Sequence, residues 1–272
     1  MLETPNDYLA GPSVSFYHGD EIKSESWRFY KNLDEDNPME FVNLEIAEEL
    51  TRVTLDFKER PEKRVLKQIT SDDMDKIFRL YADMFFSKEK LKFVIFYTIK
   101  NISKKPMKDV RFYNLYDFDI GGLFNNDSDY AYFDDAINAI VQYNANGVHV
   151  GIGTVRSEII KHYTAGNPFD LKISEHASLD DKILDGPNDL FVGLEISMGN
   201  ILPGEINTIA LIIASGETKE EFEEYFKLGK DKAKRLMPLI PEAIEKSTRN
   251  KPNDGITRQM NEILQSDRCT ST

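Results

Sequence analysis

Residues 138–154, with the sequence NAIVQYNANGVHVGIGT, predict a β-hairpin. Asn146-Gly147 lies between two runs of β-like sequence rich in apolar and small residues. Asn and Gly both tolerate the positive φ angles that a type I′ turn requires, and such a turn joins two neighbouring antiparallel strands. The segment therefore indicates antiparallel pairing in the middle of the chain.

Other segments repeat a strand-like pattern. RVTLDFKE, residues 52–59, alternates Val53, Leu55 and Phe57 with polar residues, as a half-buried strand does. LKFVIFYTIKN, residues 91–101, is apolar on both faces, which is typical of a strand between two layers. Further strands are expected at residues 110–118, 189–197 and 207–216.

The spacing of these strands predicts the fold class. Residues 72–87 fit either a short helix or a strand, and the surrounding strands favour a strand. Strands without long intervening helices indicate antiparallel sheets packed as a sandwich. We therefore predict a mainly β domain over residues 1–216.

The last part of the chain changes to a helical pattern, which predicts a C-terminal helical extension over residues 217–272. Thr218 and Glu221 form a capping box at the start of one amphipathic helix. Pro238 and Pro241 are expected to end that helix, and residues 256–266 predict a second one. The apolar stripe of the first helix is expected to dock on its own domain or on a partner.

Composition narrows the function classes. The 272 residues are 40% hydrophobic and 30% charged, which suits a globular protein with a sizeable core. A net charge of −13 opposes binding to nucleic acid or to anionic membrane surfaces. The single cysteine, Cys269, excludes an intrachain disulfide and a Cys-based zinc site. Without a recognisable secretory signal or an apolar run of membrane-spanning length, a soluble cytoplasmic protein is expected.

Three stretches in order carry a resemblance to a known family. They are DVRFYNLYDFDIGG (109–122), YAYFDDAINAIVQYNANGVHVGIGT (130–154) and FVGLEISMGNILPGEINTIALIIASGETKEEF (191–222). Together they resemble the N-terminal β-supersandwich domain of prokaryotic and archaeal glucoamylases and glucodextranases of the glycoside hydrolase family 15 type. Their fold is galactose mutarotase-like, and the resemblance spans roughly residues 90–222. The opening strands that the family usually has are not recognisable in the sequence of residues 1–50.

The resemblance has implications for function. In such enzymes an (α/α)₆ barrel with the catalytic glutamates follows the β-domain, and these 272 residues do not include it. The resemblance therefore implies a stand-alone, non-catalytic domain that associates with a glycoside hydrolase catalytic subunit, with a second copy of itself, or with an α-glucan. The alternative is a carbohydrate-active enzyme in its own right, either aldose 1-epimerase-like or an α-glucan hydrolase.

Residues 112–135 hold the candidate binding residues, because they contain eight aromatic residues, six aspartates and no Lys or Arg. Carboxylate oxygens suit calcium, although the spacing is not that of an EF-hand loop. The candidate ligands are Asp117, Asp119, Asp127 and Asp129. In turns, Asp also bonds its own backbone, which is the competing explanation.

Aromatic rings beside carboxylates also suit sugars. The candidate platform residues are Trp27, Tyr113, Tyr116, Tyr130 and Tyr132. Strand alternation places Phe112, Asn114 and Tyr116 on one face and Tyr113, Leu115 and Asp117 on the other, so at least one face belongs to the core.

An epimerase would need a general acid and a general base, usually a Glu and a His. The chain offers His18, His149, His162 and His176 together with Glu158, Glu175 and Glu195. Their surroundings match no motif of the mutarotases, and the abundance of acidic residues prevents assignment of a glycosidase pair. No catalytic residue is assigned from the sequence.

Overall fold

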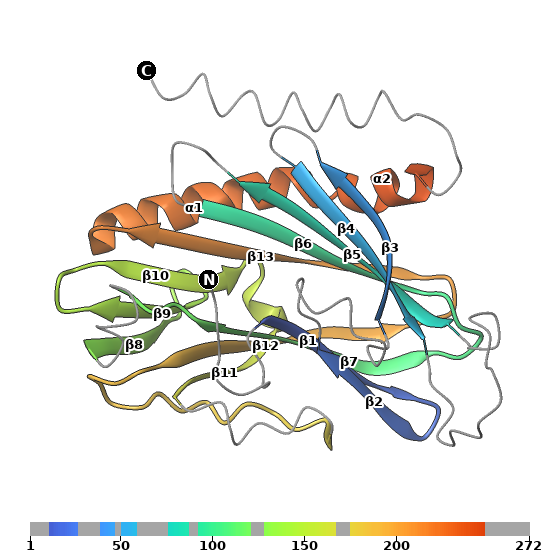
Figure 1. The fold of residues 1–272 in the computed structure, drawn as a ribbon, viewed down its shortest axis with the longest axis horizontal. Helices are drawn as coiled ribbons and strands as arrows, with labels where there is room; N and C mark the ends of the chain where they lie inside the picture. The colour runs from blue at the N-terminus through green and yellow to red at the C-terminus, as the bar shows by residue number, and fades with distance from the viewer. Residues whose placement is uncertain are drawn as a thin grey trace.

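The computed structural model describes residues 11–26, 39–46, 50–58, 76–86, 92–120, 128–166 and 175–247. Its strands form two sheets (Figure 1). The predicted Trp27, Asp127 and the helix at residues 256–266 lie outside the described residues.

The smaller sheet has five strands. Their order is β11 (Ile160–Gly166), β12 (Phe191–Ile201), β7 (Met107–Asp117), β1 (Gly11–His18) and β2 (Glu21–Ser26). Central β7 pairs with β12 on one side and with β1 on the other, both antiparallel. The central strands are therefore covered along both edges, which holds their side chains in a defined register.

The larger sheet has eight strands. Their order is β3 (Met39–Ile46), β4 (Leu50–Lys58), β5 (Lys76–Phe86), β6 (Lys92–Asn101), β13 (Ile206–Gly216), β10 (His149–Thr154), β9 (Ala139–Asn144) and β8 (Asp129–Asp134). All pairings between these strands are antiparallel. The predicted mainly β, antiparallel sandwich is confirmed, and β5 shows that the ambiguous segment is a strand.

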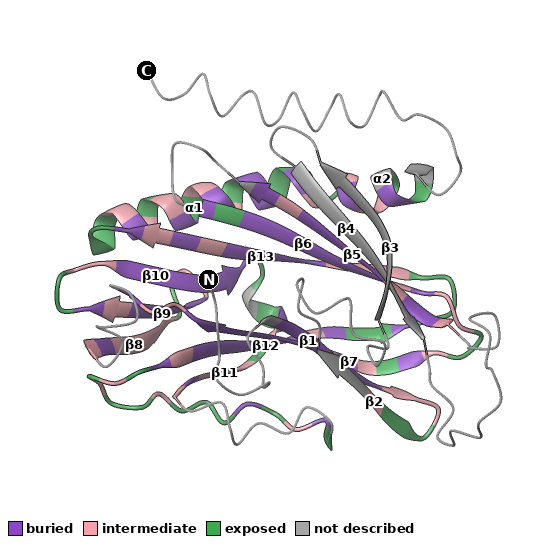
Figure 2. Ribbon diagram, viewed as in Figure 1, coloured by how far each residue is buried: buried purple, intermediate pink, exposed green. Residues whose placement is uncertain are grey.

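The main core lies between the two sheets. It contains Phe16 of β1, Phe78 of β5, Tyr97 of β6 and Phe112 of β7, all fully buried (Figure 2). The rings of Tyr97 and Phe112 lie 4.7 Å apart between centroids and join the sheets directly. The alternation of β7 sends both Phe112 and Tyr116 into this core, in agreement with the prediction that they share one face of the strand.

The hairpin β9–β10 is confirmed, but its turn differs from the predicted type I′. Only Gly147 takes a positive φ, 89°, whereas Asn146 does not. The amide of Gly147 donates to the carbonyl of Asn144, and Oδ1 of Asn144 accepts from the amides of Asn146 and Val148. The side chain of Asn144 thus organises a four-residue loop with glycine at the left-handed position.

Helix α1 (Lys219–Leu236) covers the outer face of the eight-stranded sheet (Figure 1). The hydroxyl of Thr218 accepts from the amide of Glu221, which confirms the predicted N-cap. Phe222 and Phe226 are fully buried against sheet residues such as Ile212. The apolar stripe is therefore used within this chain.

The prediction for the prolines is only half right. Helix α1 ends at Leu236, two residues before Pro238, but a further helix, α2 (Leu239–Ser247), contains Pro241. Pro241 lies in the first turn of α2, where a helix needs no backbone donor. Neither described helix is long and apolar enough to cross a membrane.

Candidate functional site

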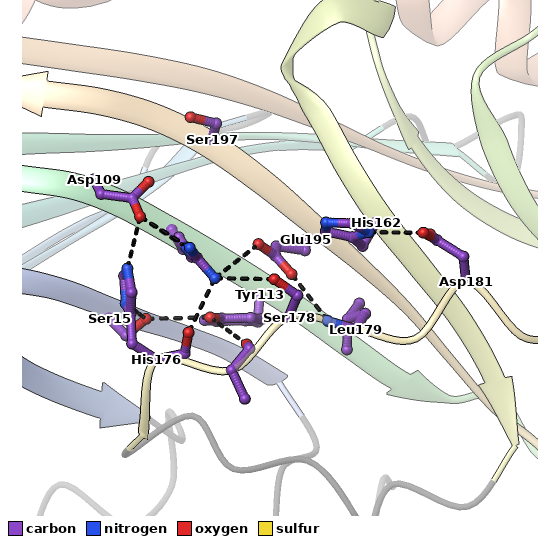
Figure 3. A network of polar contacts seen from close by, with 12 residues as sticks. Ser15, Asp109, Tyr113, His162, His176, Ser178, Leu179, Asp181, Glu195 and Ser197 are labelled. Carbon is purple, nitrogen blue, oxygen red and sulfur yellow. Dashed lines mark hydrogen bonds and ion pairs between the residues drawn. The ribbon is translucent and has the colours of Figure 1, made fainter.

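The outer face of the five-stranded sheet carries a polar network whose centre is buried (Figure 3). Tyr113 of β7 points away from the main core, and the strand register places Glu195 of β12 opposite it. His162 of β11 lies opposite Glu195 on the other side. Alternation and register therefore place an acid, a phenol and an imidazole in one row across the sheet.

Residues 175–183, the cover segment, lie over this row. Leu179 packs against Tyr113 and Leu115 in a small apolar cluster. Along β11, the amide of Asp181 donates to the carbonyl of Tyr163, and the amide of Ala165 donates to the carbonyl of Lys182. The cover segment is therefore held to the sheet by backbone hydrogen bonds at one end and by side-chain packing in its middle.

Arg111 links the cover segment to the sheet. Its Nη2 and Nε lie 2.9 and 3.2 Å from Oδ2 of Asp109. Its Nη1 donates to the carbonyl of His176 at 2.9 Å and to Oγ of Ser178 at 3.0 Å. The same nitrogen lies 3.6 Å from Oε1 of Glu195. One guanidinium thus joins two carboxylates and the cover segment, which suits its planar set of donors.

His176 is the buried centre of the network. Its Nδ1 lies 2.6 Å from Oγ of Ser15, and its Nε2 lies 2.9 Å from Oδ2 of Asp109. Ser, His and Asp in this order also form the triad of many hydrolases. Here Ser15 is fully buried, and its hydroxyl lies 3.2 Å from that of Tyr113, which donates to the carbonyl of Ala177. These contacts hold the cover segment and leave Ser15 without access to solvent.

Glu195 is the buried acid of the row, with 1% of its surface exposed. Its Oε2 accepts from the amide of Leu179 at 3.0 Å, and its Oε1 faces Arg111. Burial raises the pKa of Glu195, although the Leu179 amide and the charge of Arg111 oppose that shift. His162 lies in the same row, and its Nδ1 is 2.7 Å from Oδ2 of Asp181.

Three residues of this network have left-handed backbone conformations. The φ angles are 48° at Asp109, 57° at His176 and 55° at Asp181. Such a conformation costs a non-glycine residue about 1 kcal/mol or more. The side-chain contacts of all three residues offset that cost, so the network specifies the course of the chain at these points.

The tyrosines predicted as sugar platforms occupy different environments. Tyr113 is buried in the polar network, and Tyr116 is buried in the main core, where burial raises its pKa to about 12. Tyr130 and Tyr132 are half-buried on edge strand β8. Tyr130 stacks on Tyr143 at 5.3 Å, and the Nζ of Lys219 lies 5.6 Å from the centre of the Tyr132 ring. The structure therefore leaves Tyr130 and Tyr132 as the more accessible pair.

The predicted metal ligands are partly brought together. Asp117 and Asp119 lie in one cluster with Asp189, which the sequence prediction did not include. Asp129 is buried beside them and accepts a hydrogen bond from Nε2 of Gln142 at 2.6 Å.

The remaining histidines and glutamates lie apart from the network. His18 contacts Ser103, and His149 stacks on Tyr143. Glu158 pairs with Arg156 on the surface, and Glu175 is exposed at the start of the cover segment. Of the seven acid–base candidates, the structure gathers only His162, His176 and Glu195.

Sequence reasoning did not select Ser15, Asp109 or Arg111. The one available signal was the alternation of VRFYNLY, which places Arg111 on the face of Tyr113 and Leu115. Nothing local relates Ser15 to His176, because 161 residues separate them along the chain.

Comparison with solved structures agrees with the sandwich. A bacterial glucoamylase complexed with acarbose superposes with a TM-score of 0.51 and 10% sequence identity, and the match covers 81% of this chain. The chain has a glucoamylase-type β-sandwich fold. It covers only 28% of the glucoamylase chain. The fold expected from the three sequence stretches is thereby confirmed.

Two smaller proteins are more distant matches. A galactose mutarotase-like protein from Clostridium acetobutylicum is 10% identical, with a TM-score of 0.39, and the match covers 74% of this chain and 75% of that one. A similar protein from Lactobacillus casei is also 10% identical, with a TM-score of 0.36 and coverage of 74% and 80%. No protein-family model matches the sequence, and no curated protein matches it.

Proposed function

We propose that this protein is a non-catalytic β-sandwich unit that associates with a glycoside hydrolase. The observation that carries the proposal is that Glu195 is buried and engaged in contacts within the protein. Both of its carboxylate oxygens are in internal contacts, one with Leu179 and one with Arg111, and its side chain is buried. A catalytic acid or base must reach a substrate atom. In this arrangement Glu195 stabilises the cover segment instead.

The fold supports the same proposal. The chain resembles about a quarter of a glucoamylase, and that share contains a β-sandwich of this kind. Because the apolar stripe of α1 is buried on its own sheet, a partner would have to contact other surfaces. Of the tyrosines predicted as sugar platforms, the half-buried Tyr130 and Tyr132 on β8 are the two that would contact an α-glucan held by such a complex.

The association can be tested with purified components. The full chain would be co-expressed with each glycoside hydrolase encoded in the same genome and then analysed by size-exclusion chromatography with light scattering. We expect one hydrolase to co-elute at a defined ratio, and the isolated chain to show no hydrolysis of maltooligosaccharides. Separate elution from every hydrolase would overturn the proposal, as would hydrolysis by the chain alone.

A second candidate function is sugar epimerisation, which one observation favours. The structure brings Glu195, His162 and His176 to one face, although they are far apart in the sequence. Burial raises the pKa of Glu195, as in carboxylic acids that donate protons near neutral pH. This chemistry would require the cover segment to move away from the sheet.

Polarimetry on freshly dissolved α-glucose and α-galactose distinguishes the two candidates. An epimerase would accelerate mutarotation above the buffer rate, and Glu195→Gln would abolish the acceleration. The matched control is Glu158→Gln, because Glu158 is an exposed acid outside the network. The non-catalytic proposal expects the buffer rate for all three proteins.

A further inference from the structure

Three carboxylates converge where two distant segments meet. Asp117 ends β7, Asp119 follows two residues later, and Asp189 lies two residues before β12. Each contributes one oxygen to a group in which the oxygens are all within 4.8 Å of one another. Negative charges this close repel each other strongly unless a proton or a cation lies between them.

The electrostatic environment of Asp117 is acidic. The Asp117 side chain is 9% exposed, and the charges of Asp119, Asp189 and Asp129 act on its carboxylate. The amide of Asp119 lies 3.4 Å from Oδ1 of Asp117, which offsets little of this repulsion. The acidic residues that act on Asp117 therefore form a region of concentrated negative charge that is partly removed from water.

Two buried oxygens beside this group are an independent sign of a bound ligand. Asp129 and Gln142 are fully buried, and Nε2 of Gln142 donates to Oδ2 of Asp129. Oδ1 of Asp129 and Oε1 of Gln142 have no hydrogen-bond partner among the described residues. Buried oxygens normally receive a donor or coordinate a cation, because leaving them unpaired costs a few kcal/mol each, about 1–3.

Backbone pairing ties Asp129 to the cluster. The amides and carbonyls of Asp129 and Asn188 exchange two hydrogen bonds, of 3.2 and 3.0 Å. Asp129 is therefore fixed beside the segment that carries Asp189. Asp129 lies close enough to Asp189 and Asp119 for their charges to act on it. The unpaired oxygen of Asp129 thus belongs to the same acidic region.

We propose that Asp117, Asp119 and Asp189 bind a calcium ion, with the buried, unpaired carboxylate oxygen of Asp129 beside the group that they form. Calcium takes six to eight oxygen ligands in variable geometry, and carboxylates from loops and strand ends commonly supply them. The site joins the ends of β7 and β8 to the segment before β12. Its ligand set differs from the sequence prediction in containing Asp189. The inference is independent of the proposed function.

The test compares thermal unfolding in EDTA and in calcium. Without metal, Asp117→Asn removes a repelled charge, so the variant should unfold at a higher temperature than the wild type. In millimolar calcium, the wild type should gain stability and the variant should gain little or none. Asp189→Asn should behave in the same way. This reversal of order is not expected from a merely structural role of Asp117.

The matched control is Asp135→Asn, which changes an exposed aspartate near the end of β8. It should respond to calcium as the wild type does. The same variants can be titrated with terbium, whose luminescence nearby tyrosines such as Tyr116 and Tyr130 would sensitise. We expect calcium to displace terbium, and the affinity to fall about tenfold or more when one carboxylate is lost.

Three outcomes would overturn the inference. The first is a wild type whose unfolding temperature is the same in EDTA and in calcium. The second is an equal loss of the calcium response in Asp135→Asn. The third is a response to magnesium that equals or exceeds the response to calcium, since the proposal names calcium.

Discussion

The Nε2 atom of His176 lies 2.9 Å from Oδ2 of Asp109, and both residues have left-handed backbones. Asp109 belongs to central β7, whereas His176 belongs to the cover segment. A contact between two conformationally strained residues persists only when the surroundings hold both in place. Here the guanidinium of Arg111 donates to the carboxylate of Asp109 and to the backbone carbonyl of His176, so it supports both partners.

Replacing Arg111 should release the cover segment. Arg111→Met keeps most of the side-chain volume but leaves the buried Glu195 without its cationic partner. We expect a loss of about 2–4 kcal/mol in the free energy of unfolding, because removing one partner strands a buried charge. Urea denaturation measures the loss, and limited proteolysis should cut residues 175–183 faster in the variant.

Arg156→Met is the control for that experiment. Arg156 pairs with Glu158 at 3.4 Å, but both side chains are more than half exposed. Exposed pairs contribute less than about 1 kcal/mol, so this variant should unfold almost as the wild type does. Equal losses in the two variants would contradict the role given to Arg111.

The stability of the network should decrease in acid. Burial tends to raise the pKa of Asp109, but the hydrogen bonds from His176 and Arg111 and the charges of both outweigh it, so the pKa is lowered overall. A carboxyl group with a lowered pKa in the folded state stabilises the protein above its ordinary pKa near 3.8. That contribution is lost as the pH falls through the lower, folded-state value.

Urea denaturation of the wild type and Asp109→Asn at a series of pH values isolates this effect. The wild type should be the more stable protein at pH 6. Its advantage should shrink steadily below about pH 4. An advantage that stayed constant down to pH 2 would show that the ionised form of Asp109 is not what stabilises the cover segment.

Asp117 should produce a dependence on pH of the opposite sign. Its folded-state pKa of about 6 is above its ordinary value of 3.8. A carboxyl group with a raised pKa favours folding when protonated, so its contribution is complete below pH 3.8 and is lost as the pH rises through 6. In EDTA, the stability difference between Asp117→Asn and the wild type should therefore grow between pH 4 and pH 7.

Calcium should suppress that difference, because the bound cation replaces the proton as the partner of the Asp117 carboxylate. The measurement is the unfolding midpoint in urea at several pH values, with and without calcium. If Asp117→Asn and the wild type kept a fixed difference across this range in EDTA, the raised pKa would be refuted.

Close packing of α1 on the sheet depends on small residues. A Cβ atom at Gly153 would overlap the carbonyl oxygen of Asn138 and lie 2.6 Å from the ring of Phe226. Phe226 is a fully buried residue of α1. Gly153→Ala should therefore displace the helix and lower the free energy of unfolding by about 1–3 kcal/mol. Thermal unfolding followed by circular dichroism measures the loss.

Gly166→Ala is the comparison for Gly153. A Cβ atom there would meet only Leu184, at an ordinary contact distance of 3.6 Å. This variant should keep nearly the full unfolding temperature. A similar loss in both variants would indicate that general strand effects, rather than the approach of α1, explain the cost.

Local patterns determined most of the fold. Alternation predicted the strand that became β4, an apolar run predicted β6, and strands were expected where β7, β12 and β13 lie. Asn146-Gly147 predicted the β9–β10 hairpin. Thr218 and Glu221 predicted the start of α1. These signals are readable because strand alternation and helix capping involve residues within a few positions of one another.

Local patterns failed where the effect of a residue depended on its exact position in a turn or helix. The type of turn after β9 depended on the side chain of Asn144, and α2 formed although Pro241 indicated an end to helix. In both cases the structural effect of a residue depends on its position in the element: proline is tolerated in the first turn of a helix, and the Asn side chain can bond the backbone of a turn.

By itself, the sequence determined that this protein is an antiparallel sandwich with a helix at its C-terminal side, and it supplied the candidate histidines and carboxylates. Only the tertiary structure decided which of them meet. It joined Ser15 to His176, Arg111 to Glu195, and Asp189 to Asp117 and Asp119. Strand periodicity tells which face a residue occupies, but register and the path of the cover segment set its neighbours. Those depend on burial and hydrogen bonding across the whole molecule.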